Sequence, residues 1–271
     1  MKQAINLPKV MNLNPRSCMN KLRELENFID EEEIDLAFIS ESHDRENKKL
    51  EDNIYLENHV VISNIHQREG KGGRPVLIVN NKKYDVQNLT NSVIQVPWGV
   101  EITWALLTPK LISNDSVVQK IVLGAIYSKP NSRKKTAMLD HISETYNFLS
   151  TKYGKGVYWM LAGDTNDLKL DQILSLSPNL KSLVKKPTRL NPDNILDNII
   201  SDMGKWYQSP ECLAPLDADV GSGGKPSDHL IVVMSPISEF NNKPAREVRQ
   251  VSVRPLKQSG LWLVDKKSKL E

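Results

Sequence analysis

The chain has 271 residues, of which 39% are apolar and 25% are charged, and its mean hydropathy is −0.42. These values exclude collagen, coiled-coil and low-complexity chains and are typical of a folded globular protein. The net charge is only +3, and residues 238–271 hold eight Lys/Arg against four acids, which leaves −1 on residues 1–237. The net charge of residues 1–237 therefore does not attract a polyanion. Binding of a nucleic acid would depend on local basic patches, on the tail or on a metal ion.

Apolar periodicity predicts the secondary structure along the chain. Residues 20–33 have the spacing of an amphipathic helix. Strands are expected at 34–40, 60–63, 76–80, 104–107, 121–127, 157–162 and 230–234, with a second helix at 133–152. Strands mixed with long helices predict a layered α/β or α+β domain over residues 1–237. The periodicity fades in residues 238–271, which we interpret as a basic C-terminal tail or linker.

The cysteine spacing and the short apolar runs argue against a zinc site and against a membrane span. Cys18 and Cys212 are far apart in the sequence, and no Cys/His spacing matches a zinc site. We therefore expect two reduced thiols in an intracellular protein. The longest purely apolar runs, 157–162 and 230–234, are much shorter than the roughly 20 residues of a membrane span, so no membrane partner is expected.

Polar clusters flank several of the predicted strands. They are Ser40-Glu41-Ser42-His43, Gly163-Asp164-Thr165-Asn166-Asp167 and Ser227-Asp228-His229, with Asn14-Pro15-Arg16-Ser17 before the first helix and Tyr127 at the end of 121–127. Taken singly, each is also what an ordinary turn contains. As a set, their carboxylate and amide oxygens suit Mg²⁺ or Mn²⁺, and His229 offers a base with a pKa near working pH. Asp197 lies in a largely apolar segment, where a carboxylate needs a partner such as an imidazole.

The order of these clusters resembles the endonuclease/exonuclease/phosphatase superfamily, and most closely the apurinic-type endonuclease domain of non-LTR (LINE-type) retrotransposons. The similarity covers residues 7–237. It rests on six ordered matches, namely N-x-R-S at 14–17, the glutamate motif at 40–42, Y-x-x-P at 127–130, G-D-x-N at 163–166, P-T-R to L-D across 187–197 and S-D-H at 227–229. Arg16 stands where many cellular relatives carry an acid, which favours an element-encoded protein over a repair enzyme.

The resemblance implies a DNase I-like fold, which is a four-layer α/β sandwich of two mixed sheets flanked by helices. It implies that Asn14, Glu41 and Asp228 surround a divalent metal, Mg²⁺ or Mn²⁺. The reaction would nick a DNA strand and leave a 3′-hydroxyl that primes reverse transcription. The implied setting is the nucleus, with a reverse transcriptase domain in the parent element and the endonuclease acting as a monomer.

The resemblance also assigns roles to the other polar residues. His229, oriented by Asp197, would serve as a general base or stabilise the scissile phosphate. Asp164 would position or deprotonate the attacking water, and Asn166 and Tyr127 would hold phosphate oxygens.

Four basic residues near these motifs are predicted to contact DNA. They are Arg16, Arg189, Lys185 and Lys186. Two alternatives stay open, namely an inactive DNA- or protein-binding domain of the same fold and a phosphoesterase acting on RNA or a phospholipid head group. Every expected catalytic residue type is present, which argues against an inactive domain.

Overall fold

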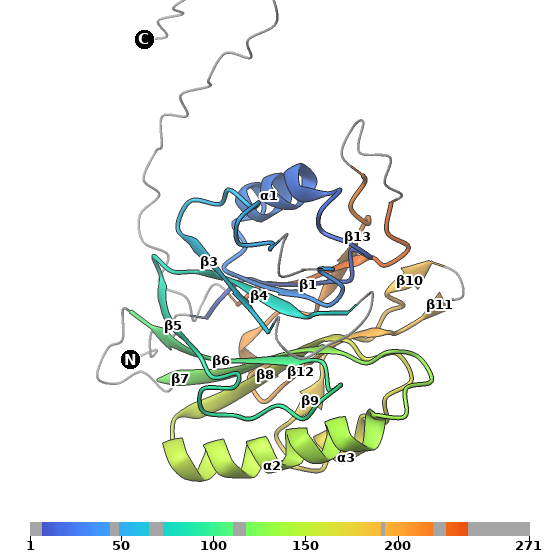
Figure 1. The fold of residues 1–271 in the computed structure, drawn as a ribbon. Helices are drawn as coiled ribbons and strands as arrows, with labels where there is room; N and C mark the ends of the chain where they lie inside the picture. Colours follow the sequence, from blue (N-terminus) through green and yellow to red (C-terminus); the bar gives the residue numbers. More distant parts are fainter. Residues whose placement is uncertain are drawn as a thin grey trace, which may run out of the picture.

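The computed structural model describes residues 7–43, 49–64, 73–110, 118–190, 193–218 and 226–237. These residues form two six-stranded sheets that are stacked face to face, and helices cover the outer side of each sheet (Figure 1). The four layers confirm the expected α/β sandwich. The tail predicted at 238–271 lies outside the described residues.

The first sheet is mixed, as the resemblance implies. Its strand order is β13 (Glu211–Leu213), β14 (Ile231–Met234), β1 (Val10–Leu13), β2 (Leu36–Ile39), β4 (Val76–Asn80) and β3 (His59–Ser63). Only β1 and β2 run parallel. A parallel pair needs a crossover connection, which α1 (Leu22–Glu31) provides on the outer face. β1 and β2 therefore end side by side, where Asn14 and Glu41 follow them.

The second sheet repeats this plan with longer strands. Its order is β5 (Tyr84–Asn88), β6 (Ile102–Pro109), β7 (Lys120–Tyr127), β8 (Val157–Asp164), β12 (Asp197–Ser201) and β9 (Lys181–Ser182). The parallel strands β7 and β8 are joined by α2 (Lys135–Tyr153), beside which lies α3 (Asp171–Leu174). β10 (Arg189–Leu190) and β11 (Asp193–Asn194) form a separate two-stranded hairpin. The interior position of β7 agrees with its apolar sequence.

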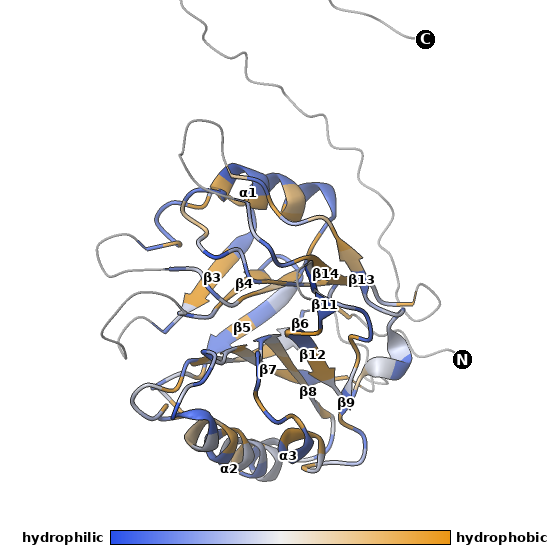
Figure 2. Ribbon diagram, turned by 90° about the vertical axis from the view of Figure 1, so that its right-hand side faces the viewer, coloured by the Kyte–Doolittle hydropathy of each residue, from blue (hydrophilic) through white to orange (hydrophobic). Residues whose placement is uncertain are grey.

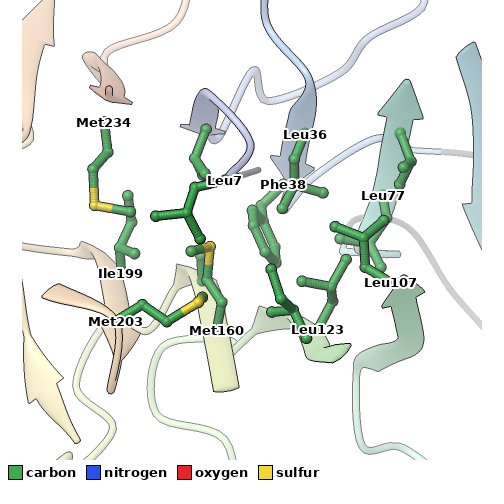
Figure 3. Close-up of a cluster of buried hydrophobic side chains, with 14 of the residues drawn as sticks. Leu7, Leu36, Phe38, Leu77, Leu107, Leu123, Met160, Ile199, Met203 and Met234 are labelled. Atoms are coloured by element: carbon green, nitrogen blue, oxygen red, sulfur yellow. The ribbon is translucent and has the colours of Figure 1, made fainter. Parts of the chain in front are cut away.

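Three hydrophobic cores hold the four layers together. Alternate residues of β7 point to opposite faces, so that Leu123 lies in the core between the sheets and Val122 packs toward α2. Figure 3 shows Phe38 from the first sheet beside Leu123, with Met160 in the same core. Burying one such side chain stabilises the fold by about 1.5–3 kcal/mol. This core keeps the two sheets, and with them the strand ends, in a fixed relation.

The helices close the outer faces. Leu25 and Ile29 of α1 are buried against the first sheet, and Figure 2 shows hydrophilic residues on the side of α1 that faces away from it. α2 ends at Tyr153, and Gly154 follows it with a φ of 66° and a ψ of −142°, a conformation that glycine adopts more readily than other residues. Among the described residues, no helix combines the length and the hydrophobicity needed to cross a membrane.

Candidate active site

The predicted site residues gather where strands of both sheets end. Tyr127 is paired with Asp164 across β7 and β8, and Asp164 is paired with Asp197 across β8 and β12. This register lines up three of the predicted site residues across the end of the second sheet. The first sheet brings Asn14 and Glu41 to the same place, because the Asn14 amide nitrogen lies 2.8 Å from Asp164 Oδ2 and 3.0 Å from Glu41 Oε1.

Gly163 determines how closely β8 approaches β7 at this edge. Its φ is 147°, and a Cβ atom added there would lie 1.9 Å from the carbonyl oxygen of Ile126. No side chain larger than hydrogen fits at that distance. Directly after it, the Asp164 backbone N–H donates to Ser40 Oγ at 2.7 Å, which links the end of β2 to the end of β8. The glycine of the G-D-x-N motif therefore places the Asp164 carboxylate.

His229 and Asp197 form a buried pair. His229 Nδ1 lies 2.8 Å from Asp197 Oδ2, and the two side chains are 7% and 0% exposed. Thr188 Oγ1 accepts the backbone N–H groups of Leu196 and Asp197, each at 3.0 Å, and so fixes the start of β12. Burial lowers the pKa of His229, but the hydrogen bond and the charge of Asp197 outweigh it, and the net pKa is raised. The pair therefore favours the protonated imidazole.

Asp164 lies against this pair in an environment that disfavours its charge. Burial and the negative charge of Asp197 raise the pKa of Asp164 to about 7, although His229 and the Asn14 amide act in the opposite direction. Ligand atoms of Asp164, Asp197 and His229 lie within 4.8 Å of one another. A carboxyl group with this pKa can take up or release a proton near neutral pH.

Glu41 is held by several donors. Burial raises the pKa of Glu41, but hydrogen bonds from His43, Asn14 and Tyr127 together bring it below its ordinary value. The carboxylate is therefore ionised at neutral pH. Burial and the charge of Glu41 raise the pKa of Tyr127, so its hydroxyl keeps its proton and can donate.

Asp228 is clamped by both arginines that the sequence assigns to DNA. Arg16 Nε lies 3.0 Å from Asp228 Oδ1, and Arg189 Nη2 lies 2.8 Å from Oδ2. Burial opposes ionisation of Asp228, but the charges of His229 and Arg16 and the Arg189 hydrogen bond lower its pKa. The predicted DNA contacts Lys185 and Lys186 are exposed in the loop that leads to Thr188. The predicted arginines thus lie inside the site, and the predicted lysines lie at its margin.

The donor set fits a divalent cation. Glu41 and Asp164 carboxylate oxygens converge on one neutral amide group, that of Asn14, and Asp197 Oδ1 is buried with no hydrogen-bond partner among the described residues. Such clustered oxygens are what Mg²⁺ and Mn²⁺ prefer. The Asn14 Oδ1 atom accepts the Arg16 backbone N–H at 2.9 Å, so its amide nitrogen, not its oxygen, faces the carboxylates in this arrangement.

Asn166 borders a cavity beside the site. Its φ of 43° is left-handed, its backbone N–H donates to Asp164 Oδ1 at 3.0 Å, and its amide donates to the Ser128 carbonyl at 3.0 Å. The cavity measures about 520 Å³, and Asn166 lines it together with Asn131, Arg189 and the hairpin residue Asn194. Asn166 is therefore fixed at the border between the acidic cluster and this cavity.

Three hydroxyl residues that sequence reasoning gave no role hold the site in place. Ser40 and Thr188 make the contacts described above, and Ser227 Oγ donates to the Asn14 carbonyl at 2.7 Å. Each lies inside one of the six motifs, so the motif itself was the available signal. The contacts could not be predicted, because each joins segments that are distant in the sequence or depends on backbone geometry.

Comparisons with known proteins give structural matches alone. No protein-family model matches the chain, and no curated protein matches its sequence. The endonuclease domain of TRAS1, a telomere-specific non-LTR retrotransposon, is similar with TM-score 0.56 and 16% identity, over 84% of this chain and 96% of that one. The AP endonuclease LMAP from Leishmania major has TM-score 0.59 and 12% identity over 84% and 86%. A mannosyl-6-phosphatase from Bacteroides thetaiotaomicron has TM-score 0.58 and 13% identity over 85% and 100%.

These similarities define the fold. The chain has the DNase I-like fold shared by endonuclease/exonuclease/phosphatase proteins, as its motifs predict. The similar structures include both nucleases and a sugar phosphatase, and a fold of this kind hosts many substrates. The reaction must therefore be argued from the site.

Proposed function

We propose that the protein is a metal-dependent DNA endonuclease that hydrolyses a phosphodiester bond and leaves a 3′-hydroxyl, of the kind encoded by non-LTR retrotransposons. The observation that carries this proposal is the buried His229–Asp197 pair, 2.8 Å apart, which lies beside Asp164 and 3.9 Å from Asp228. The Asn14 amide links Asp164 to Glu41. The fold shared with the TRAS1 endonuclease domain over 96% of that domain supports it.

The His229–Asp197 pair suggests which residue carries out each part of the reaction. Asp197 holds the His229 Nδ1 proton, which turns Nε2 toward the side where Asp228 lies, 3.9 Å away. Asp197 raises the pKa of His229 against the effect of burial, which favours a proton on Nε2, and we propose that Nε2 donates it in a hydrogen bond to an oxygen of the scissile phosphate. Asp164, whose pKa is about 7, accepts the proton of the attacking water. The water oxygen bonds to phosphorus as the bond from phosphorus to the 3′ oxygen breaks. The 3′ oxygen takes up a proton from solvent and leaves as the 3′-hydroxyl, and the phosphate stays on the 5′ end of the other fragment.

The remaining residues bind and orient. Glu41 and Asp228 would hold the divalent cation, which neutralises charge that develops on the phosphoryl oxygens. Asn14 keeps Glu41 and Asp164 in place through its amide nitrogen. The Tyr127 hydroxyl and the Asn166 amide N–H are hydrogen-bond donors, and both would bind phosphate oxygens.

The basic residues would contact the DNA backbone. Arg16 and Arg189 are bound to Asp228. If Asp228 held the cation, these guanidinium groups would become available to bind phosphate oxygens. Arginine suits this role, because its planar fork matches phosphate oxygens. Lys185 and Lys186 would extend the contact along the strand.

Plasmid nicking tests the proposal. We expect conversion of supercoiled plasmid to open circle with Mg²⁺ and none with EDTA. Asp228→Ala and His229→Ala should each lower the rate at least ~10²-fold, the scale of losing one catalytic group. His59→Ala is the matched control, because His59 lies on β3 and contacts the carbonyls of Glu57 and Ile34. Binding of DNA without nicking would favour the inactive binding domain, and neither binding nor nicking would favour another phosphoester.

A further inference from the structure

His43 contacts the proposed metal ligand Glu41 from an unusual backbone conformation. Its Nε2 atom lies 3.3 Å from Glu41 Oε2, and the His43 side chain is 30% exposed. Because an ionised carboxylate only accepts hydrogen bonds, Nε2 carries the hydrogen and donates it. None of the six motifs assigns this residue a role.

The backbone at His43 is left-handed, with a φ of 55°. Residues with a Cβ atom disfavour this region, and such strain persists where the surroundings impose it, often at functional sites. The residue before it is anchored, because Ser42 Oγ donates to the Arg74 carbonyl at 2.6 Å and the Ser42 carbonyl accepts the Cys18 N–H at 3.2 Å. From this anchored point, the left-handed turn brings the imidazole back over Glu41.

The two oxygens of Glu41 have different donors. Asn14 donates to Oε1 at 3.0 Å, His43 donates to Oε2 at 3.3 Å, and the Tyr127 hydroxyl also donates to this carboxylate. With a donor on each oxygen, the carboxylate plane is fixed from both sides. Loss of His43 would remove the donor at Oε2, and the Glu41 carboxylate would then rotate more freely about its last side-chain bond.

We propose that His43 is a positioning residue that orients the Glu41 carboxylate for the divalent cation, and that the left-handed turn is retained for this purpose. The inference rests on the proposed function, because it takes Glu41 as a ligand. His43 acts through Glu41 and makes no contact with the reacting atoms. Partners that orient metal ligands in this way typically alter metal affinity about 10–100-fold.

Mn²⁺ binding to the full chain without DNA tests this role. Free Mn²⁺ is measured by electron paramagnetic resonance, and thermal unfolding is followed on the same samples. His43→Gly removes the donor and relieves the left-handed strain, so affinity should fall about 10–100-fold while the unfolding midpoint is no lower than that of the wild type. His43→Gln keeps an amide donor of similar reach and should restore affinity to within about threefold of the wild type.

Glu33→Gly is the matched control. Glu33 is also left-handed, with a φ of 51°, but it is exposed after α1. Glycine there should raise the unfolding midpoint and leave Mn²⁺ affinity unchanged. This separates relief of strain from loss of the contact with Glu41.

Wild-type affinity in His43→Gly, a lower unfolding midpoint in that variant, or failure of His43→Gln to restore binding would each overturn the role of His43. Glu41→Gln identifies the site, since it should weaken Mn²⁺ binding in every case. If Glu41→Gln binds Mn²⁺ as the wild type does, the proposed metal site fails and this inference fails with it. If only the His43 variants bind normally, the proposed function stands and this inference alone falls.

Discussion

Replacing Asp197 with Asn removes one charge from the buried pair and changes almost no volume. The bond to His229 is 2.8 Å long, and the Asp197 side chain is fully buried. A hydrogen bond to a charged group is worth about 1.5–3 kcal/mol, and each 1.36 kcal/mol is tenfold in rate. If the Asn oxygen accepts the hydrogen bond from His229, the Asn NH₂ group takes the place of Asp197 Oδ1, which is buried and has no partner among the described residues. Burying this unpaired donor costs about 1–3 kcal/mol more. Together these contributions span about 2.5–6 kcal/mol, so we expect nicking to slow about 10²–10⁴-fold.

The rate of plasmid nicking under single-turnover conditions measures this effect. Asp202→Asn is the matched control, because Asp202 directly follows the other end of β12 and accepts the Trp159 backbone N–H at 2.9 Å. That variant should nick within about threefold of the wild type, since it is remote from the reacting groups. A loss below about tenfold in a folded Asp197→Asn protein would refute the assignment of His229 and Asp197 as a working pair.

Three further predictions concern stability and binding. Gly163→Ala should lower the free energy of unfolding by more than about 3 kcal/mol, because its Cβ would clash with backbone as well as strain it. Gly154→Ala, which meets nothing within 4 Å, should cost only the strain of its positive φ, about 1–3 kcal/mol. Equal losses in urea titrations would contradict the clash. Burial lowers the pKa of His141 from 6.5 to about 4, so the unfolded chain takes up a proton below pH 6.5 that the folded chain does not. His141 should therefore contribute a fall of about 2 kcal/mol in the free energy of unfolding between pH 7.5 and pH 5, and the difference in stability between the wild type and His141→Gln should change by this amount over that range. Removing Lys185 and Lys186 together should flatten the salt dependence of DNA binding by up to about two units of log–log slope, and an unchanged slope would exclude contacts there.

The interior strands could be predicted because burial on both faces leaves continuous apolar runs. The strand predicted at 76–80 has those bounds in the structure, and β7 and β8 contain their predicted runs. β5 is a polar edge strand with three of its five residues exposed, and β12 begins with a buried acid, so neither has such a run. β5 and β12 are therefore strands because they pair with neighbouring strands, and not because of a local apolar pattern.

The composition of the site could be predicted in the same sense, but its contacts could not. The motifs indicate that Asp197 needs a partner and that His229 is available, and the structure places the two in contact. By contrast, Arg16 and Arg189 share Asp228 although 212 and 39 positions separate them from it, and the left-handed turn at His43 leaves no local signature. Such contacts depend on the packing of the two sheets, which sequence periodicity does not specify.

The chemistry of the nick tests the central claim most directly. Plasmid nicked by the protein with Mg²⁺ is incubated with a DNA polymerase and labelled nucleotides, with and without prior phosphatase treatment. We predict that label enters equally in both samples, because hydrolysis of the bond to the 3′ oxygen leaves a free 3′-hydroxyl. Incorporation only after phosphatase treatment would mean a 3′-phosphate, and would contradict the proposed reaction.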